Sequence, residues 1–230
     1  MRINYFRLLL ICAFSTTPLT SFFPASAEAA PSAPAGPDGL TGSQIQRIES
    51  GDILVRVEPG TSSIKTVTSI GEVAASAADV YLLTTDFKNY ARIYDSIASV
   101  QVEPQTAREV EATFQLRTPW PLPWRTVTTL TRLDPAHFAF RWRRTAGSMR
   151  LYDGRMQADP LDDHHCLVFY SARVDPGFGW LPGWFVTWGQ GYVLPSIIRA
   201  IRQTLAVRTG PYWASGVQRP PFGAPLASAS

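Results

Sequence analysis

The sequence predicts an α+β fold in which a curved antiparallel β-sheet wraps around one long C-terminal α-helix. Between residues 53 and 174, segment after segment alternates apolar and polar residues, the pattern of a strand with one buried face. Short turn sequences separate these segments, which is typical of an antiparallel meander. Residues 182–208 instead carry apolar side chains at helical spacing, so this helix is the large element that can cover the sheet.

The first part of the predicted domain consists of two strands followed by short helices. Residues 53–57 and 64–73 alternate in polarity, and Pro59 and Gly60 form the turn between them. A serine at position 76, three residues before an aspartate, predicts a helix start. Apolar residues then follow at helical spacing to about position 92, namely Val80, Leu83, Phe87 and Tyr90.

Six further strands and one helix complete the prediction. The strands are expected at residues 97–102, 108–117, 123–133, 138–144, 149–158 and 166–174. The helix begins near Pro182, a residue suited to the first helical turn, and Pro195 is expected to kink it. Because a strongly twisted sheet curves away from a straight helix, we expect a cavity between them.

The N-terminus has the features of a secretory signal peptide. Arg2 and Arg7 flank an apolar run too short to span a bilayer, and small residues at 25–27 suit a cleavage site. We therefore assign residues 1–27 to a signal peptide and expect a periplasmic or secreted protein. An uncleaved membrane anchor is the alternative.

Composition defines the remaining boundaries. Residues 28–42, rich in proline, alanine and glycine, are predicted to be a flexible linker, and residues 211–230 a flexible tail. One ligand-binding domain is therefore expected at residues 43–210. Apolar residues make up 45% of the chain, which is enough for a buried core.

Loss of the signal peptide would change both charge and thiol content. The chain has 21 basic and 18 acidic residues, so removing Arg2 and Arg7 leaves 19 against 18. This balance argues against a nucleic-acid partner, which requires a concentrated basic patch. Cys12 would also be lost, so Cys166 could form no intramolecular disulfide. We expect a monomer.

Three segments carry a family resemblance, and a run at 194–202 continues the third. They read EVAASAADVY followed by DFKNY at 72–90, YDGRM at 152–156, VDPG with LPGW at 174–184, and LPSIIRAIR at 194–202. Over roughly residues 50–205 the chain resembles the START/SRPBCC superfamily (Bet v 1-like), especially its coenzyme Q-binding and polyketide cyclase-like branch. The resemblance implies a helix-grip fold with a hydrophobic pocket between the sheet and the last helix. Members bind sterols, phospholipids, quinones or polyketides, and some bacterial members are aromatases or cyclases.

Two groups of aromatic residues are candidates for the ligand site. The segment 118–124 has three prolines and two tryptophans, so it forms either a loop over the pocket mouth that touches lipid or a wide turn. At the start of the last helix, three aromatic residues share one face and either line the pocket or pack in the core. These candidates are Trp120, Trp124, Trp184, Trp188 and Tyr192.

Further candidates lie on the predicted strands. Phe138, Phe140 and Trp142 alternate and should point inward, with Arg141 and Arg143 on the opposite face and Arg144 on the apolar side. An arginine here could bind a ligand carboxylate or phosphate, or pair with a neighbouring acid such as Asp153. The predicted ligand-binding set is completed by Arg141, Tyr152 and Phe169.

Residues suited to catalysis are scarce. His164 and His165 are adjacent and would face opposite sides of a strand, so they cannot chelate one metal ion. His137 follows a turn and is expected to be exposed, and Cys166 on a strand is expected to be a core residue. The chain has no nucleophile-elbow, phosphate-loop or dinucleotide-binding motif. We predict no metal and no cofactor.

Three functions remain open at this stage. The first is an exported carrier of a hydrophobic small molecule, with possible transient membrane contact. The second is an aromatase or cyclase acting on a polyketide-like substrate in the same cavity, in which Arg141, Tyr152 or Asp153 could act as acid or base. The third is an interaction module whose core is filled and holds no ligand.

Overall fold

A computed structural model describes residues 39–59, 64–104, 106–118, 122–180 and 182–207. Within these ranges the fold is an antiparallel sheet of eight strands with four α-helices. Internal contacts divide the chain into residues 1–30 and 31–230, and every described residue belongs to the second unit. The predicted signal peptide, most of the predicted linker and the predicted tail lie outside the described residues. The elements are α1 (Gly42–Glu49), β1 (Leu54–Val57), β2 (Val67–Val73), α2 (Ala77–Thr85), η2 (Phe87–Asn89), α3 (Tyr90–Ile93), β3 (Ile97–Pro104), β4 (Glu109–Leu116), β5 (Arg125–Asp134), η3 (Pro135–His137), β6 (Ala139–Gly147), β7 (Leu151–Pro160), β8 (Cys166–Asp175) and α4 (Gly183–Ala206).

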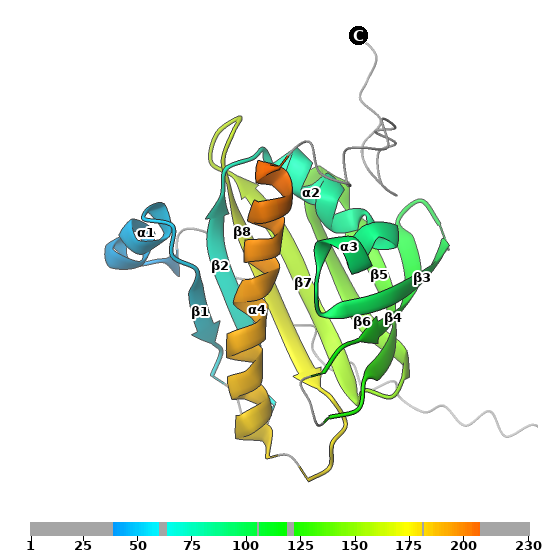
Figure 1. Ribbon diagram of the computed structural model, residues 1–230. Helices are drawn as coiled ribbons and strands as arrows, with labels where there is room; N and C mark the ends of the chain where they lie inside the picture. The colour runs from blue at the N-terminus through cyan, green and yellow to red at the C-terminus, as the bar shows by residue number, and fades with distance from the viewer. Residues whose placement is uncertain (1–38, 60–63, 105, 119–121, 181, 208–230) are drawn as a thin grey trace, which may run out of the picture. The chain divides into compact units, whose positions relative to one another are not determined.

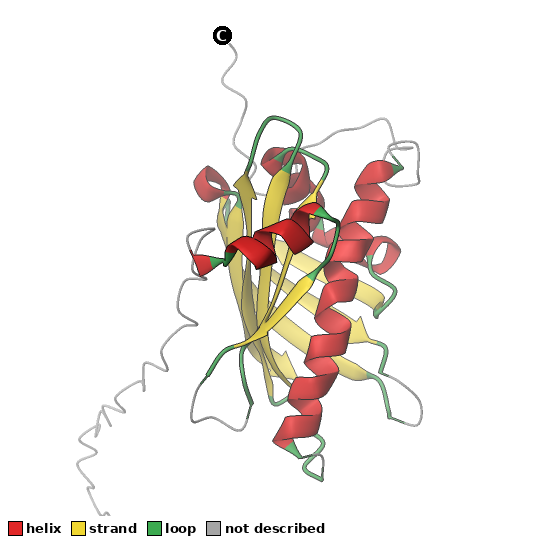
Figure 2. Ribbon diagram, turned by 90° about the vertical axis from the view of Figure 1, so that its left-hand side faces the viewer, coloured by secondary structure: helices red, strands yellow, loops and turns green. Residues whose placement is uncertain are grey.

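The strands run in the order β1-β2-β8-β7-β6-β5-β4-β3 (Figure 1). Strands β3 to β8 form a meander, and the first two strands join it through pairing of β2 with β8. Helix α4 crosses one face of the sheet and packs mainly on β2, with smaller contacts to β8 and β1 (Figures 1 and 2). This arrangement confirms the predicted α+β fold, and all eight expected strands are present.

Apolar packing and the hydrogen bonds of one arginine attach helix α4 to the sheet. Leu194, Ile198 and Ile201 are buried on its inner face. Arg202 donates hydrogen bonds to the backbone carbonyls of Glu72 at 2.7 Å and Gly51 at 2.8 Å. Helix α4 continues through Pro195.

Helix α1 was not predicted. Its only buried residue is Ile48, so its apolar pattern is weak. It begins at a capping box in which the Thr41 hydroxyl accepts from the Gln44 N–H and the Gln44 side chain accepts from the Thr41 N–H. The helix starts at the last residue of the segment expected to be a linker.

The sheet buries apolar residues on both of its faces. The main core lies beneath α2 and α4 and includes Val80, Trp142, Met156 and Ile198. A second, smaller cluster joins Ile48 of α1 to residues of β1, β2 and β8, namely Leu54, Ile70, Leu167 and Phe169. No helix in the described ranges is both long enough and apolar enough to cross a membrane.

Candidate functional site

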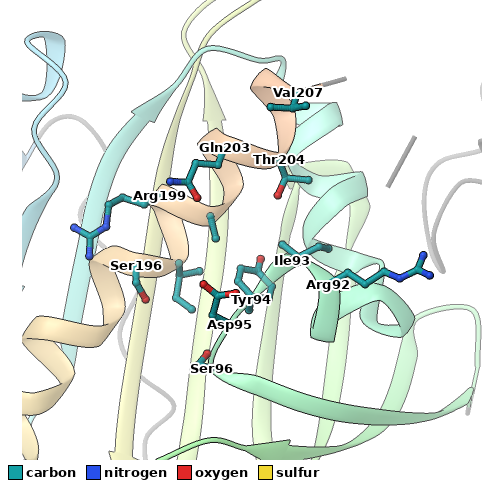
Figure 3. Close-up of a pocket in the computed structure, with 12 residues that line it drawn as sticks. Arg92, Ile93, Tyr94, Asp95, Ser96, Ser196, Arg199, Gln203, Thr204 and Val207 are labelled. Carbon is teal, nitrogen blue, oxygen red and sulfur yellow. The ribbon is translucent and has the colours of Figure 1, made fainter. Parts of the chain in front are cut away.

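A pocket of 470 Å³ opens between the α3–β3 connection and the C-terminal half of α4 (Figure 3). Its wall is apolar where Ile93 and Tyr94 face Ile197 and Ala200 of α4. Arg92 and Arg199 extend outward on opposite sides of it (Figure 3). The pocket lining is therefore mixed, and its polar residues include Asp95, Ser96, Ser196, Gln203 and Thr204.

A continuous chain of aromatic rings leads from this pocket into the core. Tyr94 lines the pocket, and its ring centroid lies 4.9 Å from that of Tyr90. Tyr90 in turn stacks on Phe114 at 5.7 Å and contacts Phe87 at 5.1 Å. We call this set the aromatic cluster, and its members are Phe87, Tyr90, Tyr94, Phe114, Phe140, Trp142, Tyr152 and Tyr170.

The tryptophan of β6 stands at the centre of the deeper part of the cluster. The Trp142 ring lies 5.2 Å from that of Tyr170, 5.8 Å from that of Phe140 and 6.2 Å from that of Tyr152. It fits against the sheet because Gly154 on β7 has no side chain; a Cβ there would lie 2.5 Å from the indole. The close approach thus depends on one glycine.

The tyrosines of the cluster are neutral hydrogen-bonding groups. Burial raises the pKa of Tyr90, Tyr152 and Tyr170, and a hydrogen bond between Tyr152 and Tyr170 links two of them. The Tyr90 hydroxyl donates to the Thr84 carbonyl. These phenols can position a ligand oxygen, but they cannot supply a negative charge near neutral pH.

Several buried polar atoms where the sheet and α4 face each other lack a hydrogen-bond partner among the described residues. On the sheet these atoms are Trp142 Nε1 and Ser69 Oγ, and on α4 they are Thr187 Oγ1 and both amide atoms of Gln190. Gln190 is 5% exposed and lies one turn before Leu194, on the inner face of the helix. Buried polar groups are nearly always paired, so these atoms are available to a bound molecule or to water.

Three of the predicted ligand-binding residues are brought together. Phe140, Trp142 and Tyr152 share the face toward α4 and belong to the aromatic cluster. Phe138 lies beside this group, where it follows η3 with a positive φ of 46° and meets the ring of Tyr81 at 6.2 Å. The alternation along this strand therefore has the predicted phase.

Two predicted residues lie on the other face of the sheet. Phe169 belongs to the second cluster beneath α1, because Val168 and Tyr170 take the inward positions of β8. Arg141 is exposed opposite Arg132 and Arg155, on the face of the sheet that points away from α4. Asp153 is paired with Arg173 at 2.6 Å rather than with an arginine of β6.

The predicted tryptophans and the last tyrosine have varied positions. Trp124 is 53% exposed and Trp184 is 71% exposed, so neither is packed in the core. Trp120 lies outside the described residues, as do the side chains of Trp188 and Tyr192 on α4. Sequence reasoning missed Tyr94 and Tyr170. The spacing of Tyr94 four residues after Tyr90, and the alternation of Tyr170 with Val168 and Ala172, could have identified them.

Groups with catalytic potential are separate from the pocket. Cys166 is fully buried, and desolvation raises the pKa of its thiol to about 12. His137 pairs with Asp134, and His165 with Asp162, on the exposed connections β5–β6 and β7–β8. Within the described part of the chain, no cluster of His, Cys, Asp and Glu could hold a metal ion.

Residues 63–206 match the family described as polyketide cyclase/dehydrase and lipid transport. The chain belongs to this family. The match confirms the resemblance of the sequence motifs to START/SRPBCC proteins. The description of the polyketide cyclase/dehydrase and lipid transport family names both an enzymatic role and a transport role.

Solved structures of this fold are similar at low sequence identity. The aromatase/cyclase ZhuI from Streptomyces sp. R1128 superposes with a TM-score of 0.51 at 18% identity, covering 65% of this chain and 98% of that one. The STAR-related lipid transfer protein of Xanthomonas axonopodis superposes with a TM-score of 0.56 at 19% identity, covering 67% of this chain and 92% of that one. Human STARD10 superposes with a TM-score of 0.54 at 14% identity, covering 81% of this chain and 90% of that one. These identities establish the fold. The comparison with curated proteins finds no match.

Proposed function

We propose that the protein is an exported, monomeric carrier of a hydrophobic small molecule such as a lipid, a sterol or a quinone. The observation that carries this proposal is the 470 Å³ pocket, which opens between the α3–β3 connection and α4 and has Tyr94 of the aromatic cluster in its lining. The transport role in the family description supports it. The basic, then apolar, N-terminus with small residues at 25–27 supports export.

Burial of apolar ligand surface would provide the affinity. At about 25 cal/mol per Å², about 300 Å² of buried apolar area is worth about 7.5 kcal/mol before the cost of association. Polar side chains that line the pocket, namely Ser196, Gln203 and Thr204, would then hold a polar end of the ligand. The carrier therefore takes an amphipathic molecule with one small polar group.

Native mass spectrometry of the protein purified from its host tests this proposal. We expect a co-purifying lipid or quinone, and a higher melting temperature when that molecule is added back. Ala200→Phe should fill the pocket wall and abolish both effects. Val193→Phe changes an exposed position of the same helix outside the pocket and should retain them. Equal ligand loading of the two variants would exclude this pocket as the site.

An aromatase or cyclase is the second candidate. Its specific support is the set of buried donors where the sheet and α4 face each other. Trp142 Nε1 and the Gln190 amide could polarise a ketone while the Tyr152–Tyr170 pair transfers a proton. The predicted roles of Arg141 and Asp153 are not retained, because both lie on the far face. Turnover of a poly-β-ketone that Tyr152→Phe abolishes would favour this enzyme over the carrier.

A further inference from the structure

Three exposed tryptophans gather at one end of the domain. Trp124 is 53% exposed, and Trp180 and Trp184 are each 71% exposed. All three lie where strands β4 and β5 are connected and where β8 leads into α4. Exposure of the apolar surface of indole rings to water is unfavourable, so a group of exposed tryptophans marks an interaction surface.

Direct contacts hold these connections together. The guanidinium of Arg125 lies 3.8 Å above the ring of Phe178, and the Phe178 ring lies 6.2 Å from that of Trp180. The guanidinium of Arg117 lies 6.0 Å from the ring of Trp124. The β6–β7 hairpin joins the same end, because the Arg150 N–H donates to the Asp175 carbonyl at 2.9 Å. The connections that carry Trp124 and Trp180 are therefore in contact through Arg125 and Phe178, and Trp184 follows Trp180 by four residues.

The three connections at this end carry more basic than acidic residues. Residues 117–126, 147–150 and 175–184 contain the basic residues Arg117, Arg125 and Arg150, and Asp175 is their one acidic residue. Asp175 is itself paired with Arg150 at 3.6 Å. We define the tryptophan surface as these three arginines together with Trp124, Trp180 and Trp184.

We propose that the tryptophan surface docks on an anionic bilayer. Indole rings favour the interface between headgroups and acyl chains, where the ring is buried and the N–H stays hydrated. Arginines beside them add attraction to anionic headgroups. Tryptophan and arginine are also enriched in protein interfaces, so self-association through this surface is a separate outcome of the test below.

Docking would serve the carrier function on which this inference rests. Trp184 belongs to the first turn of α4, the helix that forms one wall of the pocket. A bilayer that binds this end would therefore hold α4 at its N-terminus while its C-terminal half remains beside the pocket. Ligand exchange with the membrane could then follow from movement of α4.

Vesicle sedimentation tests the docking. We expect the mature protein to bind vesicles of phosphatidylcholine with about one third phosphatidylglycerol, and to bind pure phosphatidylcholine at least about tenfold more weakly. Trp180→Ala/Trp184→Ala should reduce binding to the anionic vesicles by at least about tenfold. Ile45→Ala/Leu161→Ala removes two exposed apolar side chains elsewhere and should leave binding unchanged.

Three outcomes would overturn the proposal. These are equal binding by the two double variants, equal binding to both kinds of vesicle, and concentration-dependent self-association that only the tryptophan variant abolishes. The last would make the surface a protein interface. Native mass spectrometry of the tryptophan variant separates this proposal from the carrier function, because a retained ligand with lost vesicle binding would show that the pocket still works.

Discussion

At the scale of single residues, Gly154 determines how closely Trp142 approaches the sheet. A Cβ at this position would overlap the indole ring and the Ser171 carbonyl. We therefore expect Gly154→Ala to lower the free energy of unfolding by about 2–3 kcal/mol, measured by urea denaturation. Gly189→Ala in α4, where a Cβ meets open space, should instead raise it by about 1 kcal/mol. A neutral Gly154→Ala would show that the indole can move.

Cys166 is the second residue whose environment fixes its chemistry. Its thiol is fully buried, and its pKa is raised to about 12 by desolvation and then by nearby carboxylates. The reactive thiolate is therefore scarce at pH 8. In protein that lacks residues 1–27, and therefore Cys12, we expect a thiol-specific reagent to label the native state at the rate of global unfolding and the unfolded state within seconds, as ultraviolet absorbance can follow. Rapid labelling of native protein would contradict this burial.

At the scale of elements, α1 and the strands beneath it form a structural layer separate from the ligand site. Phe169 is 1% exposed within this layer. Phe169→Ala should lower the free energy of unfolding by about 3–5 kcal/mol, because the cavity it leaves faces away from α4. The increase in melting temperature caused by ligand should remain. If a folded Phe169→Ala variant no longer showed the increase in melting temperature with ligand, the ligand would bind on the α1 face of the sheet and not beside α4.

The attachment of α4 depends on Arg202, which also belongs to this scale. Its guanidinium is desolvated, which lowers its pKa, and it donates to the carbonyls of Glu72 and Gly51. Arg202→Met should lower the free energy of unfolding by about 1–3 kcal/mol, since those carbonyls lose their donor. Arg199→Met, at an exposed position one turn earlier, should cost less than about 0.5 kcal/mol. Chemical denaturation of both variants measures the difference.

At the scale of the whole molecule, buried phenols make stability depend on alkaline pH. The pKa values of Tyr81, Tyr90, Tyr152 and Tyr170 are raised from 10.0, chiefly by desolvation. The neutral form is therefore favoured in the folded state. Its contribution to stability is complete below pH 10 and is lost as pH rises above that value.

The expected result is a urea midpoint that falls as pH increases above about 10. Tyrosinate absorbance from these four residues should appear together with unfolding and not before it. In concentrated urea the same residues should titrate near pH 10, which provides the control. Ionisation of all tyrosines near pH 10 in the folded protein would contradict the burial of the cluster.

The elements themselves were largely predictable. Alternation marked all eight strands, and the helical spacing of residues 182–208 agrees with α4 at Gly183–Ala206. Such patterns are local, because each strand or helix needs a buried face of its own. Helix α1 was missed because its capping box, Thr41 to Gln44, begins within the stretch that composition assigned to a linker.

The site was less predictable. The phase of a strand separates its two faces, so the inward position of Phe140 and Trp142 followed from alternation alone. Alternation cannot say which face of an eight-stranded sheet receives which helix, and Phe169 was therefore assigned to the wrong side of β8. The pocket joins Tyr94 to Ala200, residues far apart in the chain, and no local pattern connects them.

Fold class, element order and family could all be inferred from the amino-acid sequence, because periodicity and short motifs depend on neighbouring residues. The packing of α4 on β2, the pocket beside α3 and the exposure of three tryptophans on connections at one end could be seen only in three dimensions. These facts depend on strand order and sheet curvature, which arise from pairing between distant segments.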